Sequence, residues 1–411
     1  MKYISKENNS IIGPLIISLI GVSIFNILPD VLVNTANFSY VIVFAFTAYF
    51  LYKILFSGGK NKLSIQFNLL YFVLLFWTII IFLKGFNTDY DFLRSLFLSP
   101  YVFLPYTLPF VVKYFSIFDF KKIHSLIHYV NIIYLLFIVF FFIQPNNDIM
   151  LSIAFVEDVN KYLAFPNFLM LFLFAKLPKK EKLLSIIVFF VGFLISVFTA
   201  RRSLTWTFGW AFILLVYLLY VNNKKSILKQ LRLFIAFIFI GLAMYFFYNK
   251  YEEALFGNLM AKIDADTRGT LLRDFDADME IEDLIFGRGL NGSYLLRETD
   301  RKISENYSLQ RNIIEAGYLN IILKGGYIHI VLLLIIYLIS IYNGFFKSKN
   351  NYSKAFAAFI FLHILEAYPA GVLTFNLRFF LIWFCIAMCF NKQFLQSSDE
   401  KLDMLLMRNK F

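Results

Sequence analysis

One long hydrophilic segment, at about residues 249–311, interrupts an otherwise apolar chain and carries six arginines. They are Arg268, Arg273, Arg288, Arg297, Arg301 and Arg311. A guanidinium group stays charged and grips phosphate oxygens in a bidentate fork. Gly287 and Gly289 flank Arg288 and let the backbone turn sharply or approach a ligand there. The segment therefore predicts an anionic ligand.

A second basic motif joins two apolar runs with almost no loop between them, where the sequence TARRSL spans residues 199–204. Charges at membrane depth usually face a water-filled cavity, so Arg201 and Arg202 are candidates for a functional role. The alternative is that both guanidiniums extend to lipid phosphates. Glu366 is a further acid in apolar surroundings, and we expect it to form a structural pair with Arg378 or with one of the adjacent arginines.

A third motif lies where the hydrophilic segment returns to apolar sequence. Arg311, Glu315 and Tyr318 have the i, i+4, i+7 spacing of one helical stripe, and Lys324 follows before two glycines. An ion pair between Arg311 and Glu315 would steady that helix. At the wall of a cavity, the Glu315 carboxylate would instead accept a proton from a sugar hydroxyl. The sequence leaves both roles open.

The composition predicts an all-α polytopic integral membrane protein, because 60% of the residues are hydrophobic, 16% are charged and the mean hydropathy is +0.68. A helix crosses the hydrocarbon core with about 20 apolar residues. We expect about 12 transmembrane helices, with one large external loop that contains short helices at 251–263 and 267–276. The expected spans are 11–28, 38–56, 63–83, 95–112, 123–143, 162–177, 183–199, 203–221, 233–248, 313–342, 355–375 and 379–390.

These spans divide the chain into nine helices over residues 1–248, the external loop over 249–312, three helices over 313–391 and a tail over 392–411. The tenth span is too long for one crossing, and we expect it to break at Gly325-Gly326. Lysine-rich short loops place both termini in the cytoplasm and export the long loop. Arg201, Arg202 and Arg378 lie on the outer side against that rule, which favours a role other than topology.

Other patterns predict no further chemistry. His124 and His128 are one helical turn apart but have no third ligand nearby for a metal. The acidic alternation that begins at Asp274 lacks the glycine and the glutamate of a calcium loop. Cys385 and Cys389 lie one turn apart on one helix, where a disulfide would join no distant segments. The net charge of +12 reflects basic cytoplasmic loops and attraction to anionic lipids, and the chain has no nucleic-acid motif.

The order of these motifs resembles the O-antigen polymerases, within the superfamily that also contains the O-antigen ligases. The resemblance rests on TARRSL at 199–204, FGRGL at 286–290, EAGY at 315–318 and LKGG at 323–326. It covers the second half of the chain, roughly residues 183–342. The first half is similar in hydropathy alone.

The resemblance implies a transferase at the outer face of the cytoplasmic (inner) membrane that polymerises polyprenyl-diphosphate-linked oligosaccharides for O-antigen, capsule or exopolysaccharide. Arginines would stabilise the departing diphosphate without a metal or another cofactor. A single base would give inversion at the anomeric carbon. Membrane lipids, a flippase and a chain-length regulator are the implied partners. The implied catalytic residues are Arg201, Arg268, Arg273 and Glu315, and the implied substrate-binding residues are Arg202, Arg288, Arg311, Tyr318, Lys324 and Arg378.

Three alternatives stay open. A ligase of this superfamily typically has a histidine where the loop returns to the membrane, and Glu315 or Tyr307 occupies that neighbourhood here. A metal-dependent glycosyltransferase would need an external acidic pair such as Asp89 and Asp91. A lipid-linked oligosaccharide transporter would show two related halves and polar residues at midplane depth, whereas the halves of this chain differ.

Overall fold

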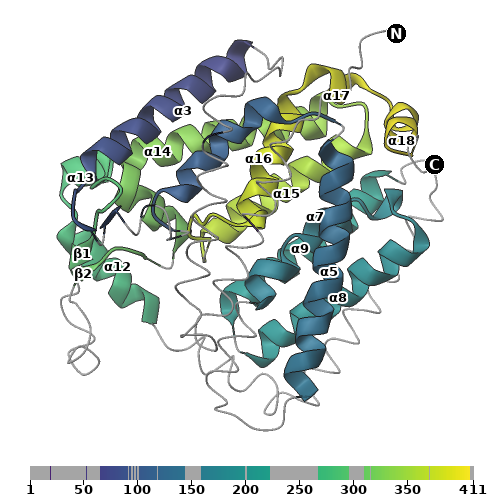
Figure 1. Cartoon of the computed structure of the whole chain (residues 1–411), viewed down its shortest axis with the longest axis horizontal. Helices are drawn as coiled ribbons and strands as arrows, with labels where there is room; N and C mark the ends of the chain where they lie inside the picture. Colours follow the sequence, from purple (N-terminus) through teal and green to yellow (C-terminus); the bar gives the residue numbers. More distant parts are fainter. Residues whose placement is uncertain are drawn as a thin grey trace.

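The computed structural model describes Leu19, Tyr52 and residues 65–90, 92–93, 96, 99, 101–117, 119–143, 159–199, 201–222, 267–295, 310–314, 316–369 and 371–407. This part of the chain is predominantly helical and contains one two-stranded sheet (Figure 1). Apart from Leu19 and Tyr52, the expected spans at 11–28, 38–56 and 233–248 and the loop helix at 251–263 lie outside the described residues. The count of twelve spans therefore stays a prediction.

Five of the described helices are long and apolar enough to cross a membrane. They are α3 (Ile65–Lys84), α5 (Asp119–Ile143), α8 (Lys179–Phe198), α9 (Arg202–Asn222) and α14 (Gly317–Tyr342). Runs of Phe, Ile and Leu favour helices there because a helix satisfies all backbone polar groups within itself. The prediction of a helical protein with apolar helices long enough to span a membrane is confirmed at this level.

Two shorter helices lie at the centre, α15 (Asn351–Ala367) and α16 (Leu377–Phe390). Every side chain of α16 is buried, so this helix is the core around which the others pack. The Asn376 side chain caps its start by accepting a hydrogen bond from the Phe379 amide at 3.1 Å. The predicted span 355–375 ends early, at Ala367, two residues before Pro369, which has no backbone N–H to continue the helical hydrogen bonds.

Two other predicted spans are wrong in their geometry. The span 95–112 contains η2 (Leu104–Tyr114), a 3-10 helix with Pro109 inside it. The Tyr71 hydroxyl donates a 2.8 Å hydrogen bond to the Pro109 carbonyl, which ties η2 to α3. The span 162–177 is divided around Pro166 into short pieces. These are the π-helix η3 (Asn160–Ala164), α7 (Asn167–Phe172) and the 3-10 helix η4 (Phe174–Lys176).

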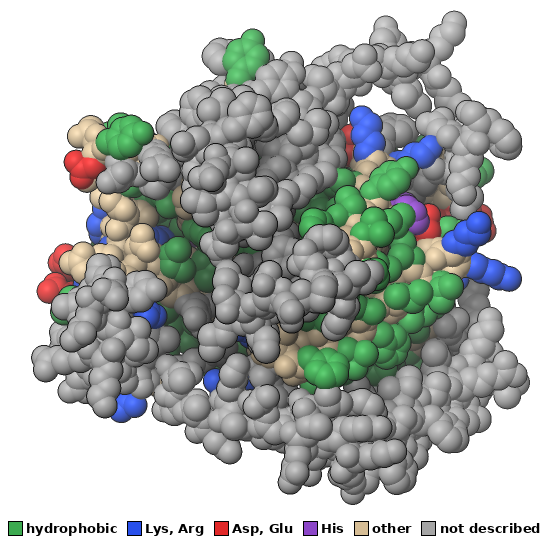
Figure 2. Space-filling view, turned by 60° about the horizontal axis from the view of Figure 1, so that its bottom comes forward, with side chains coloured by type: hydrophobic (Ala, Val, Ile, Leu, Met, Phe, Trp, Pro, Cys, Tyr) green, Lys and Arg blue, Asp and Glu red, His purple; other side chains and the backbone are tan. Residues whose placement is uncertain are grey.

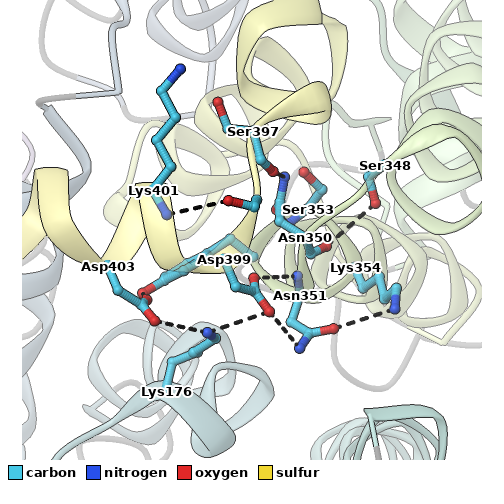
Figure 3. A network of polar contacts seen from close by, with 12 residues as sticks. Lys176, Ser348, Asn350, Asn351, Ser353, Lys354, Ser397, Asp399, Lys401 and Asp403 are labelled. Carbon is cyan, nitrogen blue, oxygen red and sulfur yellow. Dashed lines mark hydrogen bonds and ion pairs between the residues drawn. The ribbon is translucent and has the colours of Figure 1, made fainter.

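One end of the bundle, here called the C-terminal end, carries α17 (Lys392–Gln396) and α18 (Asp399–Met407). Lys176 Nζ lies 3.3 Å from Asp399 Oδ2 and 3.0 Å from Asp403 Oδ2 (Figure 3). The Tyr352 hydroxyl donates to Asp403 Oδ1 at 2.6 Å, and the Asn351 amide donates to Asp399 Oδ2 at 2.8 Å. These contacts hold α18 against η4 and the start of α15.

The opposite end, here called the loop end, carries α12 (Thr267–Asp278), α13 (Ile281–Phe286), β1 (Tyr294–Leu295) and β2 (Gln310–Arg311). Helix α12 confirms the predicted helix at 267–276. The glycine break is also confirmed, since Gly326 has a φ of 68° within α14. The stripe of Arg311, Glu315 and Tyr318 is wrong, because Arg311 pairs with Tyr294 in the sheet and α14 begins at Gly317.

The molecular surface agrees with this division into two ends. On the face in Figure 2, apolar side chains cover a broad area, and charged side chains gather toward its two sides. The helices in this part of the chain expose large apolar residues such as Leu69, Phe72 and Phe76 on α3. A lipid bilayer is the solvent in which such faces are stable.

Candidate functional site

The hydrophilic segment contains one arginine that is committed to its own fold. Arg288 Nη1 lies 2.5 Å from Asp278 Oδ2, and Arg288 Nε lies 2.7 Å from Asp283 Oδ2. The same guanidinium donates to the carbonyls of Asp278 at 2.5 Å and Ser293 at 2.7 Å. Burial lowers the pKa of Arg288, but the hydrogen bonds to Asp278 and Asp283 and the negative charges of these carboxylates together outweigh it, so the net shift is upward. Arg288, a predicted substrate-binding residue, joins α12 and α13 to the residue before β1.

The glycines beside Arg288 let the segment approach membrane helices. Gly287 and Gly289 have φ values of 73° and 81°, in the left-handed region. The Arg288 amide donates to the Leu323 carbonyl at 2.8 Å, and the Gly289 amide donates to the Lys324 carbonyl at 3.0 Å. A Cβ at Gly287 would overlap the backbone of α14 at Lys324. The close approach expected from the glycines is therefore an approach to α14.

Two lysines hold the same segment from the membrane side. Lys324 is buried, and its Nζ donates to the Gly292 carbonyl at 2.8 Å. Lys84, at the end of α3, donates its Nζ to the Gly287 carbonyl. Lys324 was predicted to bind substrate; the structure shows this partner for it within the protein, and its role toward substrate stays a prediction. The segment from Gly287 to Gly292 is thus held between α3 and α14.

The remaining arginines of the segment differ in exposure and in how much of each the structure describes. Arg273 is exposed and donates through Nε to the Gly269 carbonyl of its own helix at 3.2 Å. Arg311 is half-buried on β2. The side chain of Arg268 and all of Glu315 lie outside the described part of the chain, as do Arg297 and Arg301. The predicted catalytic roles of Arg268, Arg273 and Glu315 stay predictions.

A second charged group lies at the loop end between α15 and α16. Glu366 and Arg378 form an ion pair through Oε2 and Nη2, and each residue is 2% exposed. The predicted pairing of Glu366 with Arg378 is confirmed. His363 lies three residues before Glu366 on the same face of α15, with Nδ1 3.4 Å from Arg378 Nη2. The guanidinium carbon sits 4.1 Å from the centre of the Phe165 ring.

The dipoles of α15 and α16 disfavour the charges of Glu366 and Arg378 at their positions. Glu366 is at the negative C-terminal end of α15, and Arg378 is at the positive N-terminal end of α16. Burying an ion pair is seldom stabilising compared with apolar residues of the same size. Arg378 Nε is buried and has no hydrogen-bond partner among the described residues. Helix stability alone does not explain this pair.

Further polar residues surround the pair. Lys161 is close enough to Glu366, and Tyr162 to Arg378, for electrostatic interaction. The Tyr162 hydroxyl also lies 2.6 Å from the Tyr101 hydroxyl. With two cations against one carboxylate, the cluster of Lys161, Glu366 and Arg378 favours an additional anion.

The adjacent arginines of the TARRSL motif lie at the same end of the bundle. Arg201 comes three residues after the end of α8, and Arg202 is the first residue of α9, so the two helices have the short connection that the sequence predicted. Trp206, one turn later, donates through Nε1 to the Leu365 carbonyl at 3.3 Å. The start of α9 is therefore level with the end of α15, with Arg202 about 6 Å beyond Trp206 along its helix. The structure brings Arg201, Arg202 and Arg378 to one end of the bundle.

An aromatic pair lies beside these charges. The rings of Tyr318 and Tyr368 are nearly parallel, at 9°, with their centres 6.1 Å apart. Tyr318 is the second residue of α14, whereas Tyr368 follows α15 directly and is 71% exposed. Tyr318 was predicted to pack on a sugar ring. The sequence analysis did not predict Tyr368 or His363 as site residues. Their positions, two residues after and three residues before Glu366, could have indicated them.

No group of three or more His, Cys, Asp or Glu side chains in the described residues has the arrangement of a metal site. No family model matches the chain, and no curated protein or solved structure matches it either. The functional conclusion therefore rests on the residues and their geometry.

Proposed function

We propose that the protein is a membrane-embedded glycosyltransferase that polymerises oligosaccharide repeat units carried on a polyprenyl diphosphate. The observation that carries the proposal is the collection of Arg201, Arg202 and Arg378 with the carboxylate of Glu366 at one end of an apolar bundle. A lipid diphosphate suits such a place, because its tail is soluble in the bilayer and its head needs cations. The order of motifs that resembles the O-antigen polymerases supports the same reaction.

The chemistry follows from where charge develops. An acceptor hydroxyl attacks the anomeric carbon of the donor glycan, the bond from that carbon to the diphosphate oxygen breaks, and its electron pair stays on the diphosphate. Guanidinium groups fixed at that place stabilise the added charge, and their action is strongest in a poorly solvated site. Arg378 and Lys161 on one side, with Arg201 and Arg202 on the neighbouring helix, would supply those cations.

The tyrosine pair supports binding of the glycan. Aromatic faces pack on the apolar faces of sugar rings, and Tyr368 offers a largely exposed ring next to the charged cluster. Tyr318 stacks behind it and fixes its position. We assign the pair to a sugar of the donor or the acceptor.

The distribution of lysines supports an inner-membrane location with the loop end outside and both termini in the cytoplasm. Lysines of the C-terminal end include Lys176, Lys347 and Lys354, next to α17 or α18 or near the start of α15. A cytoplasmic excess of lysine is the usual signature of orientation. A flippase that supplies lipid-linked units and a chain-length regulator are the proposed partners.

The test is the surface glycan of a deletion strain, resolved on a gel and complemented with wild type at equal membrane abundance. We expect the deletion to leave single repeat units where the wild type gives a ladder. Full-length chains that accumulate on the lipid carrier would indicate a ligase instead. An unaltered ladder would contradict both and favour transport.

A further inference from the structure

We infer that Glu366 and Arg378 are an exchange pair: the diphosphate of the donor draws Arg378 away from Glu366, and the freed carboxylate takes the proton of the acceptor hydroxyl. This assignment rests on the proposed function and moves the catalytic base from Glu315 to Glu366. It assigns phosphate binding and proton transfer to a buried ion pair whose presence packing alone does not explain.

The surroundings of Arg378 fit a guanidinium that serves two anions in turn. A guanidinium has five N–H donors, and Nε has no partner in the described part of the chain. The rings of Phe165 and Phe379, at 4.1 and 5.0 Å from the guanidinium carbon, hold the group without using its donors. Arg378 can therefore gain a phosphate contact while its position stays fixed.

The electrostatic balance favours exchange over simple separation. A buried arginine without an anion is strongly unfavourable, but Arg378 stays compensated when a phosphate replaces Glu366. The carboxylate left behind lies in a dry site, where it gains by taking up a proton. Lys161 remains near Glu366 and moderates that gain. Binding of the donor thus prepares the base.

The proton balance of the step is complete. The acceptor oxygen forms its bond to the anomeric carbon as the bond from that carbon to the diphosphate oxygen breaks, and the electron pair leaves with the diphosphate. The hydroxyl proton passes to a Glu366 oxygen. When the lipid diphosphate departs, Arg378 returns to Glu366 and the carboxyl proton is released to the departing diphosphate or to water.

The link between the two helices lies directly over the pair. Gly371 has a φ of 91°, and a Cβ there would stand 3.4 Å from Arg378 Nη2. The link begins at Tyr368, which is largely exposed and lies two residues after Glu366. A donor whose sugar rests on Tyr368 would place its diphosphate near this link.

The first experiment measures binding of geranyl diphosphate to the full-length protein in detergent. Arg378→Lys keeps the charge but loses the bidentate fork, and we expect its affinity to fall about 10-fold or more. Glu366→Gln removes the competing anion, and we expect tighter binding than in the wild type. Asp403→Asn, which removes a carboxylate from the ion pair at the C-terminal end, is the matched control and should bind as the wild type does. Equal affinity in Arg378→Lys and wild type would overturn the exchange.

The second experiment measures polymerisation of purified lipid-linked repeat units. We expect Glu366→Gln to lower kcat about 100-fold or more while donor binding is kept, as for loss of a general base. The double variant Glu366→Arg/Arg378→Glu rebuilds the pair with the charges reversed, and so guards against simple misfolding. A structural pair predicts that this variant regains turnover, whereas the exchange predicts a folded protein without it.

The outcomes separate the two proposals. If wild type binds geranyl diphosphate but makes no polymer, the proposed polymerase fails and the base assignment fails with it, while the Arg378→Lys affinity still decides the phosphate contact. If wild type makes polymer and either Glu366→Gln or the reversed pair matches its kcat, the polymerase stands and the exchange is refuted.

Discussion

Arg288 and Arg378 lie toward the same end of the molecule and have opposite surroundings. Arg288 is in the hydrophilic segment and meets two carboxylates and two carbonyls of its own fold. Arg378 is fully buried at a helix end, meets one carboxylate, and has an Nε with no partner among the described residues. The arginine in the conspicuous segment is structurally committed, whereas the one in apolar sequence retains donors for a ligand.

The contrast teaches how this fold divides its charges. A hydrophilic segment must organise itself without a large core, so its charges are used to join short elements. A charge inside an apolar bundle is too unfavourable to serve only that purpose, since apolar residues would pack as well. If the proposed function is right, charge density along the sequence is a poor guide to where the chemistry of this protein lies.

The largest effect is expected from removing one charge of the buried ion pair. Arg378→Gln leaves Glu366 buried without its cation, and we expect a loss of about 3 to 5 kcal/mol of stability. Adding Glu366→Gln should restore most of it, because no isolated charge remains. Thermal unfolding in detergent measures both variants. Equal melting temperatures of Arg378→Gln and wild type would mean that the pair is not buried as described.

A smaller effect is expected from the docking of the segment onto α14. Gly326→Ala adds a Cβ at a φ of 68° and drives it into the Ile285 backbone, so we expect a loss of about 2 kcal/mol or more. Limited proteolysis near residues 279–295 should become faster. Gly209→Ala is the matched control, because a Cβ there meets nothing within 4 Å. Equal proteolysis of the two variants would argue against the docked segment.

Arg288→Ala sharpens the comparison directly. It removes the hydrogen bonds that join α12, α13 and β1, and we expect about 1 to 3 kcal/mol less local stability. Hydrogen exchange of the amides near residues 278–295 should accelerate, while geranyl diphosphate binding stays within about twofold. Loss of geranyl diphosphate binding with unchanged hydrogen-exchange rates would show that Arg288 is a phosphate ligand.

The smallest effect is expected at Arg273. Its side chain is exposed and bonds only within the turn of α12, in the contacts that the described residues show. The resemblance implies a catalytic role for Arg273, but the exchange pair places the chemistry elsewhere. On that account we expect Arg273→Ala to change stability by less than about 0.5 kcal/mol and to keep the glycan ladder. A collapsed ladder at normal membrane abundance would return the loop arginines to the catalytic centre.

The sequence predicted much of the fold, because apolar runs of helical length have few alternatives in a bilayer. Five such helices, the break at Gly326 and the helix at α12 agree with it. It failed where proline acts, since hydropathy alone does not distinguish a regular span from η2 or from the pieces around Pro166. Those segments are rich in apolar residues, but their backbone is not a continuous α-helix.

The candidate site was predicted in part. The pair of Glu366 and Arg378 followed from the rarity of such charges in apolar sequence, and the position of Arg201 and Arg202 followed from the missing loop. The commitment of Arg288 and Lys324 did not follow, because their partners are backbone carbonyls and residues brought together by folding. Helical spacing also misplaced Arg311, since the chain forms a strand there before α14 begins.

The most direct test of the central claim compares Arg378→Lys with Arg288→Lys in the complemented deletion strain, at equal membrane abundance. Both changes keep the charge and remove the planar fork. The account predicts that Arg288→Lys retains the ladder of repeat units and that Arg378→Lys reduces it to single units. A ladder kept by Arg378→Lys and lost in Arg288→Lys would place the chemistry in the hydrophilic segment and contradict the account.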